Sequence, residues 1–209
     1  MFYDTHTNNH GLPFNPFKAC IVPRPIAWIT SLSNNGVLNL APYSYFNAVS
    51  DFPPMIIFST TTKHHDGSEK DTIRNVEELK EFVVNIPVWE LREEVNITST
   101  DFDRGISEVD IAKLETLPSR IVKPPRIKGT PIQLECIYYK SIQLPVCDEK
   151  HTNRTIIGRV VGIHIEDNLI VDGKVDVTMF NPISRLGYME YSVIEKKFSM
   201  ERPYINKVV

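Results

Sequence analysis

The sequence predicts a mainly β protein with peripheral α-helices, an antiparallel β-barrel built from hairpins. Three observations support this fold class. Apolar runs rich in β-branched residues recur along the chain, strong turn signals separate them, and helical periodicity is confined to short stretches. Neither an internal repeat nor a break in composition divides the chain. We therefore expect one domain over residues 1–209, with a loose N-terminal arm at 1–14 and a charged C-terminal tail at 195–209.

The first third of the chain predicts a short helical turn and then the clearest hairpin. The turn is expected around residues 15–21, where Pro23 stops it. Residues 26–30 and 37–40 are rich in β-forming side chains. Between them, residues 33–36 read Ser-Asn-Asn-Gly, and Asn and Gly tolerate the positive φ of a tight turn. These runs predict two antiparallel neighbours.

The next stretch predicts a buried strand followed by a helix. Residues 55–59 form a continuous apolar run after two prolines, which predicts a strand buried on both faces. Residues 60–67 are expected to form a polar loop. Asp71 is then expected to cap a helix that runs to about Lys80. Its apolar positions recur every three residues, as one face of a helix requires: Ile73, Val76 and Leu79.

Later segments return to β structure. Residues 134–144 predict a long strand, and residues 155–165 predict its antiparallel partner. The remaining expectations are a strand at 82–86 ended by Pro87, a charged helix at 89–97, an irregular region at 98–130, a turn at 172–173 and a loop at 181–188.

Composition restricts the functional class. The net charge is -3 and the pI about 6.1, which disfavours nucleic acid and anionic membranes as non-specific partners. No apolar run reaches the roughly 18 residues that span a bilayer, and the first residues lack a secretory pattern, so we expect a cytoplasmic protein. Three widely spaced cysteines, Cys20, Cys136 and Cys147, predict idle thiols and no disulfide framework.

Lys70-Asp71-Thr72 stands at the predicted start of a helix. A helix N-terminus exposes unpaired N–H groups and the positive end of the dipole, so it suits a phosphate. Lys70 would add a charge and Thr72 a hydroxyl donor, while Asp71 would cap the helix and turn away. The alternative is an ordinary solvated helix start. The histidines before it, His64 and His65, could reach the phosphate or solvent, and we predict no metal because a third ligand is not visible.

Residues 39–44 suit the edge of a flat ring. Pro42 cannot donate to a β-ladder, so we expect the strand to end there and free nearby backbone groups for a ligand. The ring faces need apolar cover, for which Trp28, Tyr43 and Phe46 are candidates, with the protein core as the alternative role. We expect Trp28 to lie in the core.

Three blocks occur in a fixed order: PRPIAWITS at 23–31, NLAPYSYF at 39–46 and GSEKDT at 67–72. Together they resemble the flavin reductase-like family of FMN-binding split-barrel proteins, which includes nitrilotriacetate monooxygenase component B-like and flavoredoxin-like members. The resemblance is densest from 19 to 85 and returns at 158–164 and 184–191. It implies a six-stranded antiparallel Greek-key split β-barrel and a homodimer with FMN near the subunit interface.

The resemblance also implies an activity. Many members are NAD(P)H:flavin oxidoreductases that use NADH or NADPH, and some supply reduced flavin to a partner monooxygenase. An electron carrier without NAD(P)H activity, as in flavoredoxin-like proteins, is the alternative, and an oxygenase- or oxidase-type flavoenzyme is a third. The sequence lacks G-x-G-x-x-G, P-loop, H-E-x-x-H and G-x-S-x-G motifs, which disfavours the corresponding enzyme classes.

Site residues follow from the matching motif positions. His164 is the one catalytic candidate, with a core or interface histidine as the alternative. Arg185 could pair with a phosphate or face solvent, and after it this chain has Gly187-Tyr188 where many members have a doubled glycine. The residues that the resemblance implies as flavin contacts are Thr30, Ser31, Asn39, Ala41, Ser44, Lys70, Thr72 and Arg185.

Overall fold

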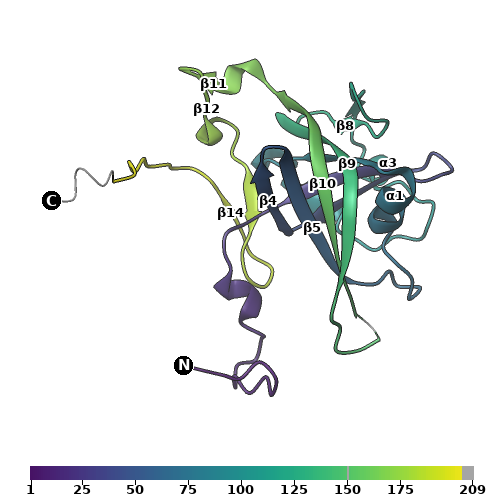
Figure 1. Ribbon diagram of the computed structural model, residues 1–209, viewed down its shortest axis with the longest axis vertical. Helices are drawn as coiled ribbons and strands as arrows, with labels where there is room; N and C mark the ends of the chain where they lie inside the picture. Colours follow the sequence, from purple (N-terminus) through teal and green to yellow (C-terminus); the bar gives the residue numbers. More distant parts are fainter. Residues whose placement is uncertain (150, 204–209) are drawn as a thin grey trace.

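The computed structural model describes residues 1–149 and 151–203. Its centre is a curled antiparallel sheet of seven strands in the order β3-β2-β6-β9-β10-β5-β4 (Figure 1). The mainly β fold class and the split-barrel fold are thereby confirmed, although the main sheet has seven strands where six were expected. The strands are β2 (Ala27–Leu32), β3 (Leu38–Tyr43), β4 (Tyr45–Asp51), β5 (Pro54–Thr62), β6 (Glu81–Asn85), β9 (Ile132–Leu144) and β10 (His151–Ile165).

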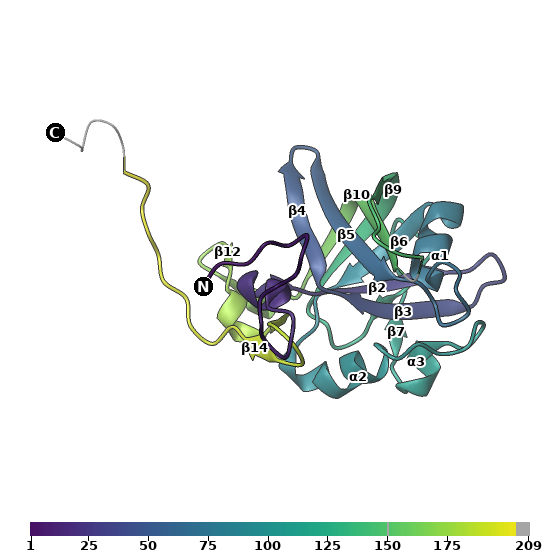
Figure 2. The ribbon, with the colours of Figure 1, turned by 90° about the horizontal axis from the view of Figure 1, so that it is seen from below.

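One residue explains why the sheet curls. β3 and β4 lie at opposite edges of the sheet, yet only Ser44 separates them in the chain. Consecutive Cα atoms are about 3.8 Å apart, so the two edges must come together at this residue. We call this junction the seam. The sheet thereby closes into a barrel whose edges meet at Ser44. Figure 2 shows β3 and β4, the two edge strands on either side of this junction.

The predicted hairpins are confirmed. β2 pairs with β3 from Ala27↔Tyr43 to Leu32↔Leu38, and β9 pairs with β10 along most of their length. The expectation that Pro42 ends its strand was wrong, because Pro42 lies within β3 opposite Trp28. β3 is an edge strand, where a missing N–H costs no ladder hydrogen bond on the solvent side.

β5 also differs from its prediction. The strand continues to Thr62, into residues expected to form a loop, and burial alternates along it instead of covering both faces. Ile56, Phe58 and Thr60 point into the barrel, while the residues between them are partly exposed. The apolar run was misleading because a barrel strand of an antiparallel sheet needs only one buried face.

Two apolar clusters lie on the two faces of β2. Ala27 and Ile29 belong to the barrel interior with Phe58, Phe82 and other strand residues. Trp28 faces the other way, into a second cluster with the helices outside the barrel. Gly158 shows how tight the interior is, since a Cβ there would lie 2.5 Å from the Phe82 ring. The core position expected for Trp28 is confirmed, and its indole N–H donates to Thr98 at 2.8 Å.

Helices cover the barrel from outside. The predicted helix is α1 (Asp71–Leu79), and its Ile73 and Val76 are buried against the barrel cluster. The charged helix appears as η2 (Trp89–Leu91) followed by α2 (Arg92–Ile97). The region expected to be irregular contains short elements: α3 (Glu108–Ile111), β7 (Thr116–Leu117) and β8 (Arg126–Ile127).

A small second sheet lies beside the barrel. It joins β1 (Arg24–Pro25), β13 (Ile183–Arg185) and β14 (Tyr191–Val193), so the expectation of a loop over 181–188 was wrong. Local sequence does not reveal this pairing, because β1 and β13 are more than 150 residues apart. The other elements are the predicted helical turn η1 (Phe17–Cys20), η3 (Asp167–Leu169), η4 (Val177–Met179), and the hairpin β11 (Ile170–Val171) and β12 (Lys174–Val175) around the predicted turn.

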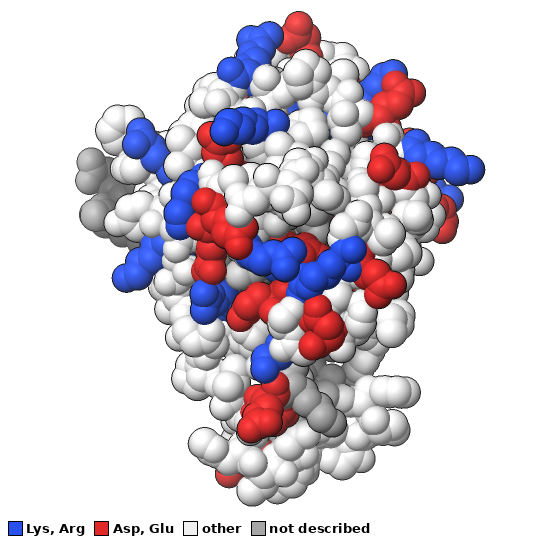
Figure 3. Space-filling view, turned by 90° about the vertical axis from the view of Figure 1, so that its right-hand side faces the viewer, with Lys and Arg blue, Asp and Glu red and all other residues white. Residues whose placement is uncertain are grey.

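The ends of the chain carry little regular structure. Residues 1–14 hold neither helix nor strand, nor do 195–203, and 204–209 of the predicted tail lie outside the described residues. Among the described residues, none of the helices is both long and apolar enough to cross a membrane. On the face shown in Figure 3, Lys and Arg side chains are interspersed with Asp and Glu, and the view shows no large patch of one sign. The single-domain organisation stays a prediction.

Candidate functional site

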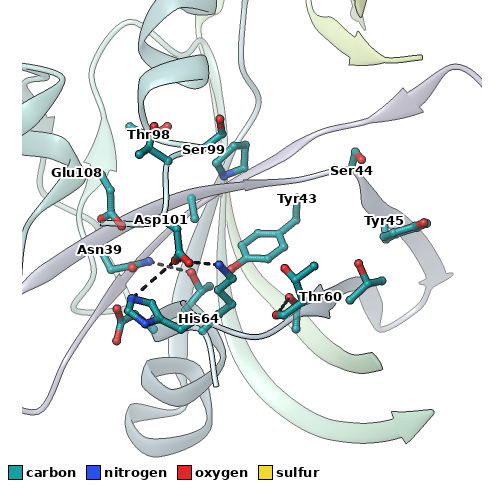
Figure 4. Close-up of a pocket in the computed structure, with 18 of the residues that line it drawn as sticks. Asn39, Tyr43, Ser44, Tyr45, Thr60, His64, Thr98, Ser99, Asp101 and Glu108 are labelled. Carbon is teal, nitrogen blue, oxygen red and sulfur yellow. Dashed lines mark hydrogen bonds and ion pairs between the residues drawn. The ribbon is translucent and has the colours of Figure 1, made fainter. Parts of the chain in front are cut away.

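A cleft of about 320 Å³ opens along the seam, and we call it the seam cleft (Figure 4). β3 and β4 form one wall, and the end of β5 forms another. The loop before α1 and the loop after α2 close it. Its volume reaches the lower end of the range of about 300–1,000 Å³ found for small-molecule sites. Five residues of the predicted flavin-contact set line it: Asn39, Ala41, Ser44, Lys70 and Thr72.

The start of α1 lies in the wall of the seam cleft. Lys70 is the N-cap residue, so the expectation that Asp71 caps the helix was wrong by one position. A lysine side chain has no acceptor, and the helix N-terminus accordingly has no side-chain cap hydrogen bond. The first-turn N–H groups of this nine-residue helix therefore lack the usual capping partner. The positive end of the helix dipole is available at the cleft.

Hydrogen bonds hold the polar floor of the seam cleft in place. The Asn39 side-chain amide donates to the Thr72 hydroxyl at 2.8 Å and to the Ser31 hydroxyl at 3.4 Å. Asn75, on α1, donates to the same Ser31 oxygen at 3.2 Å. Burial raises the pKa of Tyr43 well above its ordinary value, and the neighbouring Thr72 side chain opposes this rise. β3 and α1 are thus tied together before any ligand binds.

Two of the three acidic residues in the seam cleft have cationic partners. Asp71 forms ion pairs with Arg74 and Arg104, so its charge is directed toward arginine. Asp101 accepts from the Lys70 ammonium at 2.9 Å. Both pairs reduce the repulsion that an anionic ligand would meet at the helix start.

Glu108 is the third acid, and it has no ion-pair partner among the described residues. Its carboxylate accepts the Leu40 N–H at 2.9 Å and is 8% exposed. Burial raises the pKa of Glu108 to about 7, with Asp71 and Asp101 adding to the shift and the Leu40 N–H opposing it. A titratable acid with a pKa near neutrality in a cleft is a common feature of functional sites.

Three predicted flavin contacts lie elsewhere. Thr30 is fully buried and its hydroxyl donates to the Pro125 carbonyl at 2.6 Å. Ser31 is also fully buried and lies behind Asn39. Arg185 lines a neighbouring cleft, described below. Their role as flavin contacts stays a prediction that these positions do not support.

His164 does not line the seam cleft. Its Nε2 lies 2.5 Å from the carboxylate of Glu135, which also accepts the backbone N–H groups of Arg120, Ile121 and Val122. Although burial raises the pKa of Glu135, hydrogen bonds from the Arg120 backbone and from His164 bring it below its ordinary value. These contacts match the structural alternative for His164.

His64 and His65 meet an acid that the sequence did not reveal. Potential ligand atoms of His64, His65 and Asp101 lie within 4.8 Å of one another. The Nε2 of His64 contacts the Phe102 carbonyl at 2.9 Å, and Asp101 already binds the Lys70 ammonium. The protein's own groups therefore compete for these atoms, and we assign no metal to them.

Sequence reasoning missed much of the seam cleft. Residues 59–62 at the end of β5, residues 98–101 after α2, and Glu108 all line it. The run of hydroxyl residues from Ser59 to Thr62 is visible in the sequence, but the sequence does not indicate that it lies beside the cleft. Glu108 lies in a stretch expected to be irregular, where neither spacing nor periodicity singles it out.

A second cleft of about 300 Å³ adjoins the first, and we call it the side cleft. The two share lining residues that include Lys18, Ser44 and Tyr45. The small sheet supplies Arg24, Arg185 and Tyr191 to the lining of the side cleft. Tyr188, where a second glycine was expected from the resemblance, also lines it. Tyr188 has a φ of 54°, a left-handed conformation that is uncommon for a side chain of this size.

Comparisons with known proteins agree with this geometry. The flavin reductase like domain pattern matches residues 19–178. A Halalkalibacterium halodurans protein described as uncharacterized is 37% identical over 90% of this chain and 89% of its own. Nitrilotriacetate monooxygenase component B from Bacillus cereus matches with a TM-score of 0.87 and 33% identity, over 96% of this chain and 98% of its own. The structure of Pseudomonas fluorescens 2-nitrobenzoate 2-nitroreductase NbaA matches with a TM-score of 0.82 and 28% identity, over 98% of each chain.

The chain belongs to the flavin reductase-like family. This membership, with a fold shared with flavin-associated proteins, supports a flavin-related oxidoreductase or electron carrier.

Proposed function

We propose that the seam cleft binds FMN and that the protein is an NAD(P)H-dependent flavin oxidoreductase, in which hydride passes from the nicotinamide to N5 of the flavin. The observation that carries the proposal is the meeting of Lys70, Thr72 and the uncapped start of α1 beside Asn39. Cofactor chemistry of this kind needs the protein to bind and orient the flavin, and no side-chain acid or base is required for hydride transfer.

The start of α1 suits the FMN phosphate. Free N–H groups at a helix N-terminus, with the positive end of the dipole, bind phosphate oxygens. Lys70 adds a full positive charge, and its three N–H donors can serve both a phosphate and Asp101. Asp71 does not oppose this arrangement, because Arg74 and Arg104 hold its carboxylate.

The rest of the seam cleft suits the polar edge of the flavin ring. Asn39 and Ser44 present polar side chains, and Ala41 leaves space between them. The Asn39 amide is already held by Thr72, so little side-chain entropy is lost when it orients a ligand. Tyr43 is partly exposed in the cleft and is the aromatic candidate for covering a ring face.

A carrier without NAD(P)H activity is the second candidate. Both candidates use the same flavin site in the seam cleft, and they differ in whether NADH or NADPH reduces the bound flavin. A partner that receives reduced flavin is part of the first proposal, in line with the name of the Bacillus cereus neighbour, a monooxygenase component. The homodimer and the cytoplasmic location remain predictions.

FMN binding is tested by titrating the full chain with FMN and following flavin fluorescence. Lys70→Met keeps the aliphatic stem and removes the charge. Because charge-assisted hydrogen bonds contribute about 1.5–3 kcal/mol, we expect the FMN dissociation constant to rise about tenfold to hundredfold. Lys174→Met, on exposed β12, is the matched control and should leave the affinity unchanged. Equal FMN affinity in wild type and Lys70→Met would contradict the phosphate assignment.

Oxidoreductase activity is tested separately. The FMN-loaded protein is mixed with NADH or NADPH in the presence of excess FMN, and nicotinamide oxidation is followed by absorbance. Sustained turnover with either donor supports the reductase. If neither donor is oxidised while FMN still binds, the carrier is the correct assignment.

A further inference from the structure

The side cleft contains positive charge that nearby acids do not balance. Lys18, Arg24 and Arg185 line it, and none of the three forms an ion pair with any carboxylate in residues 1–149 or 151–203. Arg24 is only 7% exposed, and its guanidinium donates to the carbonyls of Lys18, Ile21 and Leu186. A buried cation satisfied by neutral groups alone keeps its full charge, and an anion in the cleft would offset that cost.

These cations are held in place rather than free. Arg185 donates to the Tyr188 carbonyl at 2.5 Å, and its guanidinium lies 4.3 Å from the centre of the Tyr191 ring. Arg24 is fixed by its three carbonyl partners and by a long contact of 3.5 Å to the Ser44 hydroxyl. Prior ordering of charged side chains lowers the entropy cost of binding an anion.

Aromatic side chains supply the other half of the lining. Tyr45, Tyr188 and Tyr191 all line the side cleft, with Ile26 and Met189 adding apolar surface. The left-handed backbone of Tyr188 is a costly way to present this ring. Ring surfaces beside fixed cations suit a ligand that joins a flat ring to a negative charge.

The size and position of the side cleft further restrict the class of ligand that it can bind. The side cleft holds about 300 Å³, which suits one ring with one acidic group. The side cleft is continuous with the seam cleft through Ser44 and Tyr45.

We propose that the side cleft binds a single-ring aromatic carboxylate next to the flavin site. That this ligand is a substrate rests on the proposed function, because a ligand in the side cleft can react with a flavin only if the flavin occupies the seam cleft. Binding itself does not depend on FMN, so the two proposals can fail separately.

The test is isothermal titration of the full chain, without FMN, with benzoate as the probe. Benzamide lacks the charge and cyclohexanecarboxylate lacks the flat ring, so both should bind more weakly than benzoate. Arg185→Gln removes one cation, and we expect the benzoate dissociation constant to rise at least about tenfold. Lys174→Gln is the matched control. Arg24 is unsuitable for substitution because its carbonyl contacts hold the segment together.

Tyr188→Gly gives a second, independent readout. Glycine adopts the positive φ without strain, so this variant should fold at least as well as wild type while losing the ring. We expect weaker benzoate binding in a protein with an unchanged or higher melting temperature, a combination that damage to the fold would not produce.

FMN titrations of the same variants separate the two proposals. Weakened benzoate binding by Arg185→Gln with unchanged FMN affinity supports the side cleft as a distinct site. Two results would overturn it: no saturable benzoate binding, or equal binding of benzoate and benzamide.

Discussion

The seam cleft and the side cleft lie next to each other, but they differ in whether their charged side chains form ion pairs. In the seam cleft, Asp71 and Asp101 are matched with cations, and the acid left without a cation is Glu108. In the side cleft, Lys18, Arg24 and Arg185 form no ion pair with a carboxylate of the described residues. The seam cleft therefore offers ordered hydrogen-bonding groups with its charges largely paired, whereas the side cleft offers net positive charge against aromatic surface.

This difference shows how two neighbouring clefts can select different ligands. Affinity in the seam cleft should depend on the positions of donors and on the helix start, which a ligand with many polar atoms can use. Affinity in the side cleft should depend on a single negative charge and one ring. Since Ser44 and Tyr45 belong to both, a change that acts on only one cleft is the sharpest way to test the comparison.

The largest expected effect comes from Glu108→Gln in the seam cleft. Gln keeps an oxygen that accepts the Leu40 N–H and removes the charge. The pKa of Glu108 rises from 4.5 to about 7 on folding, which corresponds to about 3 kcal/mol. At pH 8 we therefore expect Glu108→Gln to be more stable than wild type by up to about this amount, measured by urea unfolding.

The pH dependence has a defined sign. Below about pH 4.5 the carboxyl is protonated in both the folded and unfolded states, and wild type and variant should be equally stable. As the pH rises to about 7, the unfolded chain loses its proton first, so wild type loses stability relative to the variant. Asp71, Asp101 and Tyr43 are the titratable groups facing Glu108, and they are unchanged in both proteins. A stability difference that did not change with pH would contradict this account.

Gly187→Ala is expected to act on the side cleft alone. A Cβ at Gly187 would lie 2.5 Å from the Cβ of Ala19 and 2.9 Å from its Cα, so the segment carrying Arg185 and Tyr188 must shift. Overpacking of this kind costs about 1–3 kcal/mol, and we expect weaker benzoate binding with FMN affinity retained. Thermal unfolding and the two titrations measure both effects.

The double variant Ala19→Gly with Gly187→Ala provides the control. Removing the Ala19 methyl group relieves the shorter contact, so part of the lost stability and benzoate affinity should return. If FMN binding fell as strongly as benzoate binding in the single variant, the two clefts would not be separable.

The smallest effect is expected within the seam cleft. The Asn39 amide and the Thr72 hydroxyl share a 2.8 Å hydrogen bond, and both face the proposed ligand. Asn39→Ala and Thr72→Val should each weaken FMN binding by about fivefold, since one neutral hydrogen bond contributes about 1 kcal/mol. The double variant should lose less than the sum, because the shared bond is counted once. Strict additivity would mean that the two groups act independently.

Several elements could be predicted from the sequence because their signals are local. The turn at 33–36 and the stripe of Ile73 and Val76 specify a hairpin and a helix through backbone preference and periodicity. The Lys70-Asp71-Thr72 motif predicted a helix start with a polar mouth, and the structure differs only in which residue is the cap. The errors at Pro42 and β5 have one cause, since the position of a strand in a sheet decides whether a proline or an exposed face is tolerated.

In the candidate site too, some features could be predicted from local sequence and others depend on the tertiary structure. The sequence by itself determined the main strands and the start of α1, because each depends on neighbours within one element. Only the tertiary structure decided that Glu108 enters the seam cleft, that His164 binds Glu135 and that Arg24 and Arg185 share the side cleft. These pairings join residues 29 to more than 150 positions apart. They arise from the pairing of β9 with β10, from the pairing of β1 with β13, and from the contact of Glu108 with β3.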